Sequence, residues 1–241
     1  MIDRLSQHAF LSGPLGPASV VWDLGANQGE FCLAVARKYG CKVVAAEPVP
    51  ELAAALSGKS QLVTVLQNAV GGTDGTVTFD YDLTKNKTGS MMGLDVVGGL
   101  LNEASTLKRV SVQMWSLETM FTNIGAQRVD LLKLDIEGAE LDLLLKTPGE
   151  VLQRCDQITI EFHDYWYPEL RERTEEAKAR LKSLGFHMIR FTPNNKDVLF
   201  VNSRTLPMSG AQKFWAGMVL RNVNGFGRML SIWGRKLTGR Y

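Results

Sequence analysis

The sequence has few cysteines and no long run of apolar residues. Its three cysteines, Cys32, Cys41 and Cys155, show neither C-x-x-C nor zinc-type spacing, so we expect buried free thiols. The first twenty residues contain no continuous apolar segment, which argues against a signal peptide. No run approaches the roughly 18 apolar residues that a membrane-spanning helix needs. These absences predict a cytoplasmic protein.

Acidic residues are absent after Asp197, although seven of the 27 basic residues follow it. On a helical wheel, the apolar side chains of the last thirty residues, Trp215 and Trp233 among them, fall in one arc. The basic side chains fall in another, which predicts a cationic amphipathic helix. We expect this helix to contact the domain itself or a second copy of the chain, giving a homo-oligomer. An anionic membrane surface, with the protein peripheral to it, is the next alternative, and nucleic acid ranks last.

Short apolar strands alternate with helices along most of the chain. The strands are continuously apolar, which is typical of a parallel sheet that helices cover on both faces. A last pair of strands, joined by Pro-Asn-Asn at residues 193–195, predicts a hairpin. The predicted fold class is therefore α/β: a doubly wound, mostly parallel, seven-stranded Rossmann-like sheet with one antiparallel strand from the C-terminal hairpin. The strands are expected at residues 19–24, 42–46, 62–66, 129–134, 157–162, 186–191 and 198–201, and the helices at 30–39, 51–56, 117–123, 139–145 and 169–183.

The same alternation divides the chain into three parts. Residues 1–18 are predicted to be an N-terminal extension, residues 19–203 the α/β domain, and residues 204–241 the basic tail. Within the domain, residues 68–114 break the alternation with two extended segments around a stretch rich in Gly, Asn, Lys and Thr. We expect this excursion to lie over the carboxyl edge of the sheet and to carry substrate specificity. The extended segments are residues 77–81 and 110–114.

The turn after the first strand reads Asp-Leu-Gly-Ala-Asn-Gln-Gly at residues 23–29, where doubly wound folds bind nucleotides. Gly25 and Gly29 permit a tight turn and the close approach of a ligand to bare backbone. Glu47 ends the second strand, where a carboxylate can accept hydrogen bonds from both hydroxyls of a ribose. Together these features predict a nucleoside site; the alternative is a structural glycine turn without a ligand.

Two residues of this turn favour S-adenosylmethionine over a nicotinamide dinucleotide. The dinucleotide fingerprint G-x-G-x-x-G receives a pyrophosphate, but here Asn27 replaces its second glycine. Asp23 precedes the turn, where a carboxylate would repel a pyrophosphate and attract the ammonium group of a methionine moiety. We therefore predict S-adenosylmethionine as the cofactor. The alternatives are a nicotinamide-dependent oxidoreductase and a nucleoside-binding module without turnover.

Ionisable side chains surround the end of the fourth predicted strand, at the edge where parallel sheets bind ligands. Lys133 and Asp135 alternate along this strand and point to one face, so they can form a buried ion pair beside the site. Glu137 and Glu140 have a structural alternative, because acidic groups near a helix N-terminus stabilise its dipole.

A second group, Glu161 and His163, follows the next strand and shares one face of it. Methyl transfer to an alcohol requires removal of a proton, and histidine suits that task, so His163 is the candidate base. The alternative is a histidine that only anchors a loop. A further alternative is that Asp135, Glu161 and His163 hold a divalent metal, which the spacing does not require. The candidate catalytic residues are Lys133, Asp135, Glu161 and His163.

The chain resembles the FkbM-type methyltransferases, within the class I S-adenosylmethionine-dependent enzymes, over residues 20–202. The most specific shared segment is Leu-Leu-Lys-Leu-Asp-Ile-Glu-Gly-Ala-Glu at residues 131–140. The others are the turn at residues 23–29, Ala-Glu-Pro ending at Pro48, Asn-Ala-Val at residues 68–70 and Trp-Ser-Leu-Glu-Thr-Met at residues 115–120. The chain departs from the family pattern at Glu118, where Asp is usual, and in its basic tail.

The resemblance implies methyl transfer to a hydroxyl of a sugar, a glycan or another secondary metabolite. The acceptor is then a small molecule or a glycan. The expected cofactor-binding residues are Asp23, Gly25, Ala26, Asn27, Gly29, Glu47, Pro48, Asn68, Ala69 and Asp135.

Overall fold

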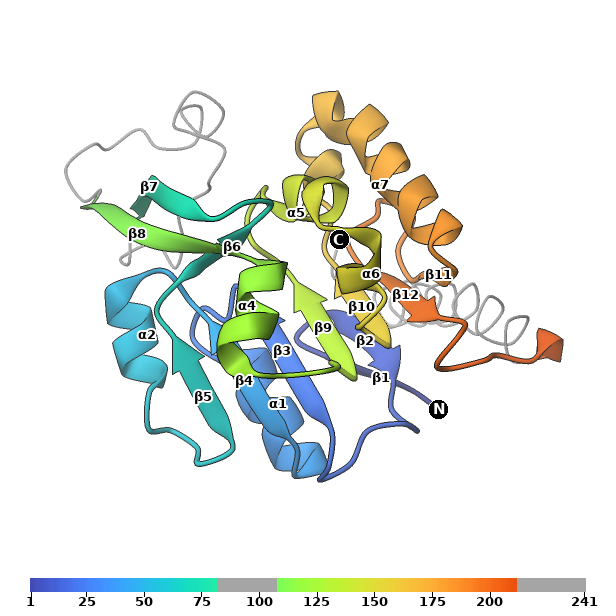
Figure 1. Cartoon of the computed structure of the whole chain (residues 1–241), viewed down its shortest axis with the longest axis horizontal. Helices are drawn as coiled ribbons and strands as arrows, with labels where there is room; N and C mark the ends of the chain where they lie inside the picture. The colour runs from blue at the N-terminus through green and yellow to red at the C-terminus, as the bar shows by residue number, and fades with distance from the viewer. Residues whose placement is uncertain (82–107, 212–241) are drawn as a thin grey trace, which may run out of the picture.

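The computed structural model describes residues 1–81 and 108–211, and a seven-stranded sheet forms its centre (Figure 1). The strands, in spatial order, are β11 (Phe186–Arg190), β12 (Val198–Asn202), β10 (Gln157–Ile160), β9 (Leu131–Leu134), β3 (Val20–Leu24), β4 (Lys42–Ala46) and β5 (Val63–Leu66). Every neighbouring pair from β10 to β5 is parallel, whereas β12 is antiparallel to both β10 and β11. The predicted fold class is confirmed, including its one antiparallel strand.

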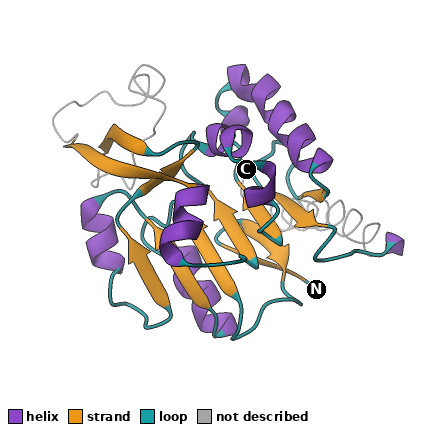
Figure 2. Ribbon diagram, in the orientation of Figure 1, coloured by secondary structure: helices purple, strands orange, loops and turns teal. Residues whose placement is uncertain are grey.

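Helices lie on both faces of this sheet, and alternation along each strand assigns its side chains to one face or the other (Figure 2). In β3, Trp22 and Leu24 pack with α4, α5, α6 and α7, whereas Val21 packs on the opposite face with α1. Burial on both faces is the reason why the strands are apolar throughout. The helices are α1 (Glu30–Tyr39), α2 (Pro50–Leu56), α4 (Leu117–Ile124), α5 (Glu140–Lys146), α6 (Gly149–Leu152) and α7 (Arg171–Ser183).

A separate three-stranded sheet interrupts the alternation. It consists of β6 (Ala69–Gly71), β8 (Lys108–Ser116) and β7 (Gly75–Tyr81), in that spatial order. β7 and β8 pair antiparallel, so the predicted extended pair is confirmed, with longer strands than the sequence indicates. Because β6 begins three residues after β5 ends, this sheet starts at the carboxyl edge of the large sheet (Figure 1). The rest of the excursion, residues 82–107, lies outside the described residues.

Some predicted boundaries shift by one or two residues. The strand predicted at residues 129–134 is β9 only from Leu131, after a single bridge between Val129 and Cys155. The strand predicted at residues 157–162 ends as β10 at Ile160, and two short 3-10 turns follow it, η2 (His163–Tyr165) and η3 (Pro168–Leu170). The predicted amphipathic helix of the tail falls in residues 212–241, outside the described residues, so its contacts stay predictions. Among the helices that the structure describes, none has the length and apolar character to span a bilayer.

The first eleven residues form a β-hairpin where the sequence predicts only an extension. β1 (Ile2–Leu5) pairs antiparallel with β2 (His8–Leu11). The turn residues Ser6 and Gln7 both have positive φ, at 44° and 70°. Two-residue turns of this kind favour Asn-Gly or Asp-Gly, so Ser-Gln is a weak signature and the hairpin is hard to recognise in the sequence.

Two polar side chains hold this hairpin, Gln157 in β10 and Asp197 directly before β12. The Gln157 amide accepts a hydrogen bond from Leu11 N at 2.7 Å and donates one to Leu11 O at 3.1 Å. Asp197 accepts a hydrogen bond from Ala9 N at 3.1 Å and forms an ion pair with Arg4 at 3.1 Å. The hairpin is therefore packed onto the domain, although the domain boundary at residue 18 stays a prediction.

We expect Gln157→Leu to lower the free energy of unfolding by about 1–2 kcal/mol, because it leaves two backbone groups of Leu11 without their partner. Urea unfolding measures the loss. The matched control is Gln113→Leu, where an exposed amide makes one long contact to Thr76 at 3.3 Å. That change should stay within about 0.5 kcal/mol. Equal losses in the two variants would show that the Gln157 tether contributes nothing.

Candidate active site

The turn at residues 25–29 joins β3 to α1 and requires glycine at its first and last positions. Gly25 and Gly29 have φ of 80° and 86°. A Cβ on Gly25 would lie 1.8 Å from the carbonyl oxygen of Asp135, and one on Gly29 would lie 2.2 Å from a methyl group of Leu56. The N–H groups of Gly25 and Ala26 both donate to Ala46 O at 3.0 Å. This bare backbone gives a ligand close approach at the carboxyl edge.

Glu47 follows β4 and ties this turn to the neighbouring strand. Its side chain is 3 % exposed, and its two oxygens accept hydrogen bonds from Asn27 N at 2.7 Å and Val49 N at 2.9 Å. Burial raises the pKa of Glu47, while the two backbone donors oppose that rise. Each carboxylate oxygen can accept a further hydrogen bond. The chemistry of a buried carboxylate beside bare backbone therefore fits the ribose of a nucleoside.

The other predicted cofactor positions lie at the same edge. Pro48 and Asn68 are half-buried, and Ala69 is buried at the start of β6. Since these residues follow β4 and β5, they extend the surface that Glu47 begins. Direct contact of each with the cofactor stays a prediction.

Lys133 is a buried cation at the centre of the site. Its ammonium group lies 2.9 Å from Asp23 Oδ1, 2.8 Å from Gly25 O and 3.6 Å from Asp135 Oδ2. Burial by itself would lower the pKa of Lys133, but Asp23 and Asp135 raise it above its usual range. Because its N–H donors are directed to these three groups, Lys133 holds parts of the protein together. We therefore interpret it as a positioning residue instead of the catalytic residue that the sequence predicts.

Asp23 also differs from its sequence-based interpretation. The residue is 0 % exposed, and besides pairing with Lys133 it accepts a hydrogen bond from Cys32 N, in the first turn of α1, at 3.1 Å. A carboxylate enclosed in this way does not present a free charge to the ammonium group of a ligand. Its contribution is to hold the turn and the helix start in place.

Carboxylates gather beyond the ends of β9 and β10. Burial acts to raise the pKa of Asp135, but Lys133 and His8 hold it well below its usual range. Glu161 accepts a hydrogen bond from the Tyr165 hydroxyl at 2.6 Å and has Lys196 at 3.7 Å. The predicted grouping of Asp135 and Glu161 at one edge is therefore present in the structure.

His163 lies between the two glutamates of the β9–α5 turn. Its Nε2 is 3.6 Å from Glu137 and its Nδ1 is 3.5 Å from Glu140. Burial would lower the pKa of His163, but Glu140 and Glu137 raise it to about 9. The imidazole is then protonated at neutral pH, so it must lose a proton before it can act as a base. The role of His163 as the proton acceptor stays a prediction.

The two glutamates of this turn have different surroundings. Glu140 is buried and accepts hydrogen bonds from Ile136 N at 2.7 Å and Gly138 N at 3.0 Å, which confirms a structural role for it. Glu137 has φ of 52°, a conformation that is uncommon for residues other than glycine, and its side chain is 43 % exposed. Partial burial of its carboxyl group and repulsion from Asp135 raise the pKa of Glu137 to about 7. Glu137 is therefore the acid of this turn that reaches solvent.

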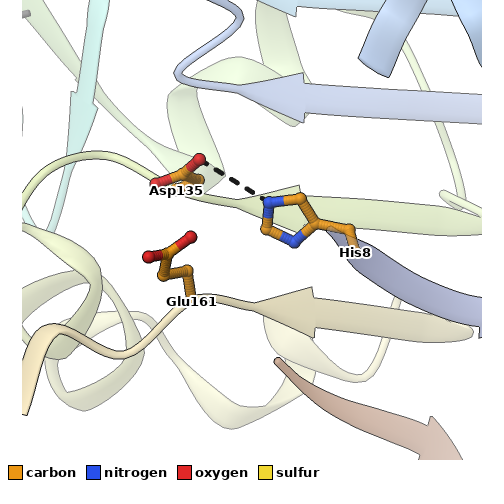
Figure 3. A group of neighbouring side chains, drawn as sticks. All are labelled: His8, Asp135 and Glu161. Carbon is orange, nitrogen blue, oxygen red and sulfur yellow. Dashed lines mark ion pairs between the residues drawn. The ribbon is translucent and has the colours of Figure 1, made fainter. Parts of the chain in front are cut away.

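The sequence does not predict the position of His8. This residue lies in β2, is 1 % exposed, and has its Nε2 3.6 Å from Asp135 Oδ2 (Figure 3). Its ring packs against Phe31 of α1. Only the fold of the hairpin brings a residue this early in the chain to the carboxyl edge, and no local pattern indicates it.

Comparison with known proteins identifies the family. The model of the methyltransferase FkbM domain matches residues 23–188, which is more than half of the chain. The chain belongs to the FkbM methyltransferase family. The expected resemblance is confirmed, and S-adenosylmethionine is the cofactor that fits the turn and Glu47. When bound, it supplies an electrophilic methyl group.

The matches to individual relatives cover similar shares of this chain but different shares of the relatives. Methyltransferase sdnD of Sordaria araneosa is 29 % identical over 213 residues, which cover 77 % of this chain and 80 % of that protein. Methyltransferase 1 of Beauveria bassiana is 26 % identical over 189 residues, covering 72 % of this chain and 74 % of that protein. The AMB antimetabolite synthetase AmbE of Pseudomonas aeruginosa is 26 % identical over 206 residues, and there the match spans 72 % of this chain and only 10 % of AmbE.

Among solved structures, the chain is similar to the fibrillarin pre-rRNA processing protein of Methanococcus jannaschii. The TM-score is 0.43 with 15 % sequence identity, and the match covers 79 % of this chain and 68 % of that chain.

We expect Lys133→Met to lower the free energy of unfolding by about 3–5 kcal/mol, because Asp23 is left as a buried charge without its partner. Chemical denaturation measures the loss, and adding Asp23→Asn should restore part of it. The control is Lys146→Met, which breaks an exposed ion pair with Asp142 and should cost less than about 1 kcal/mol. A loss in Lys133→Met no larger than in the control would contradict the interpretation of Lys133.

We expect Glu47→Gln to weaken binding of S-adenosylhomocysteine by about 10- to 100-fold, since hydrogen bonds to a charged group contribute about 1.5–3 kcal/mol. The new amide would also replace one acceptor oxygen by an NH2 group, which would then face the backbone N–H of either Asn27 or Val49. Titration calorimetry measures the affinity. Glu51→Gln is the control and should bind as the unmodified chain does, because the Glu51 carboxylate bonds to Tyr81 and Lys108 instead of the cofactor turn. Unchanged affinity in Glu47→Gln would remove Glu47 from the cofactor site.

Proposed function

We propose that this FkbM methyltransferase transfers a methyl group to a hydroxyl oxygen of a sugar, a glycan or another secondary metabolite. The observation that carries the proposal is the position of the polar groups at the carboxyl edge. Gly25 of the cofactor turn packs directly on the carbonyl of Asp135, and the side chains of Asp135, Glu161 and His163 lie beyond it. A donor on the turn and an acceptor on the acidic group would therefore be neighbours.

The chemistry of an oxygen acceptor explains why acidic side chains gather at the carboxyl edge of the sheet. Carboxylates accept hydrogen bonds from hydroxyl groups, so they can orient a polyhydroxylated acceptor for in-line attack. An alcohol must also lose its proton as the new oxygen–carbon bond forms. Two side chains are placed to receive it: His163, which the sequence indicates, and the neighbouring Glu137, which reaches solvent.

The family comparison supports methyl transfer over the two alternatives that the sequence leaves open. A nicotinamide-dependent oxidoreductase finds no support, since Asn27 interrupts the dinucleotide fingerprint and the matching family is one of methyltransferases. Only an assay of methyl transfer distinguishes an active enzyme from a binding module without turnover. One relative is named as an antimetabolite synthetase, a name that agrees with a secondary-metabolite acceptor.

We expect transfer of labelled methyl groups from S-adenosylmethionine to pooled sugars, glycans and hydroxylated metabolites. Alkali treatment then identifies the product, because methyl ethers survive it, whereas methyl esters are hydrolysed. A product that is labile to alkali, or a methylamine in the mass spectrum, would replace hydroxyl methylation with another acceptor atom. No transfer to any pool, despite tight binding of S-adenosylhomocysteine, would favour the binding module.

Once an acceptor has been identified, we expect His163→Gln or Glu137→Gln to lower kcat by about 10²–10⁴-fold, the usual contribution of a general base. The affinity for S-adenosylhomocysteine should stay unchanged in both variants, because the ion pairs of these side chains join His163 to Glu137 and Glu140 and not to the cofactor turn. Stopped assays over a range of acceptor concentrations separate kcat from KM. Full turnover in both variants would mean that neither residue accepts the proton.

A further inference from the structure

Three side chains from separate parts of the chain converge at the edge of the sheet. A ring nitrogen of His8 in β2, a carboxylate oxygen of Asp135 after β9 and one of Glu161 after β10 all lie within 4.8 Å of one another. Figure 3 shows the imidazole directed at Asp135, with the Glu161 carboxylate beside both. We infer that His8, Asp135 and Glu161 bind one divalent cation.

The donor set has the chemistry of a transition-metal site. One imidazole with two carboxylates suits Mn²⁺, Fe²⁺ or Zn²⁺, because imidazole nitrogen and carboxylate oxygen are both common ligands of these ions. Ligand atoms bound at about 2.0–2.2 Å from one ion lie about 3–3.5 Å apart. The 3.6 Å between His8 Nε2 and Asp135 Oδ2 is already close to that spacing, and the Glu161 ligand atom lies within 4.8 Å of the other two ligand atoms.

The surroundings of His8 provide an independent reason for a ligand. The residue is almost fully buried, and buried polar groups usually have a hydrogen-bond partner. Its Nδ1 finds no such partner among the residues that the structure describes, and its Nε2 lies 3.6 Å from Asp135 Oδ2. Folding the hairpin onto the sheet therefore places a metal-ligating nitrogen on an acidic edge.

The nearby cations leave this edge acidic. Lys133 lies 3.6 Å from Asp135, but its shorter contacts are to Asp23 and Gly25 O. Lys196 lies 3.7 Å from Glu161 and is about one-third exposed. Two carboxylates that approach each other this closely repel, and a divalent ion between them removes that repulsion.

A second cluster competes for the same ion. Asp135, Glu140 and His163 also bring ligand atoms within 4.8 Å of one another. Two backbone hydrogen bonds, from Ile136 N and Gly138 N, hold Glu140 against its own turn, whereas Glu161 accepts one from the Tyr165 hydroxyl. We therefore assign the ion to the cluster that contains His8.

This assignment gives the hairpin a role at the active site. Residues 23–188 match the family model, and His8 lies outside that segment. An ion held by Asp135 would lie beside the Gly25 turn, where it could bind an acceptor oxygen and lower its pKa. The inference goes beyond the proposed function, because the chain would bind the ion regardless of which acceptor atom receives the methyl group.

Titration of the metal-free chain with Mn²⁺, followed by the electron paramagnetic resonance signal of the free ion, tests the site without donor or acceptor. We expect one ion per chain, with affinity at least about tenfold lower in His8→Gln and in Glu161→Gln. The matched control is His187→Gln in the edge strand β11, which should bind as the unmodified chain does. Circular dichroism checks that each variant is folded.

Electron spin echo modulation shows whether an imidazole binds the ion in the unmodified chain, even if a variant unfolds. We expect one imidazole nitrogen coupled to bound Mn²⁺, kept in His163→Gln and lost in His8→Gln. Absence of stoichiometric Mn²⁺ binding would overturn the inference. So would a nitrogen coupling that disappears in His163→Gln, or an affinity that His8→Gln leaves unchanged. Since no methyl transfer is measured, these outcomes are independent of those of the proposed function.

Discussion

The buried ammonium group of Lys133 joins the two halves of the candidate site, and the geometry of both depends on it. A charge removed from water must be matched closely by opposite charge and by hydrogen-bond acceptors. Asp23 and Gly25 O provide these on the side of the cofactor turn, and Asp135 provides the third contact on the side of the acidic group. The ends of β3 and β9 are therefore held at a fixed distance, although they are separated by more than one hundred residues along the chain.

The cofactor turn is held from two further directions. Asp23 accepts a hydrogen bond from the start of α1, and Glu47 accepts one from Asn27 at the opposite side of the turn. The missing Cβ of Gly25 lets this turn contact the carbonyl of Asp135 directly, so a side chain there would separate the turn from the acidic group. A preformed site of this kind needs little rearrangement to place a methyl donor beside its acceptor.

Much of this arrangement is predictable from the sequence, and the limits have physical causes. Continuous apolar strands alternating with helices are a local signal, so the sheet and its antiparallel strand follow from the pattern. The glycine turn, Glu47, Asp135 and Glu161 are also local, because each ends a strand at one known edge. The position of His8 depends on long-range contacts of the hairpin with Gln157 and Asp197, which no spacing indicates. The roles of Lys133 and Asp23 were harder to predict, because their mutual neutralisation appears only once β3 and β9 are neighbours.

A crystal structure with bound S-adenosylhomocysteine tests the central claim, that one buried ion pair places the methyl donor against the acidic edge. The account predicts that the ribose hydroxyls bond to Glu47 and that the thioether sulfur lies between the Gly25 turn and the carboxylates of Asp135 and Glu161. It also predicts that the contacts of Lys133 stay as they are without ligand. A ligand bound away from Glu47, or a sulfur directed away from Asp135, would contradict it.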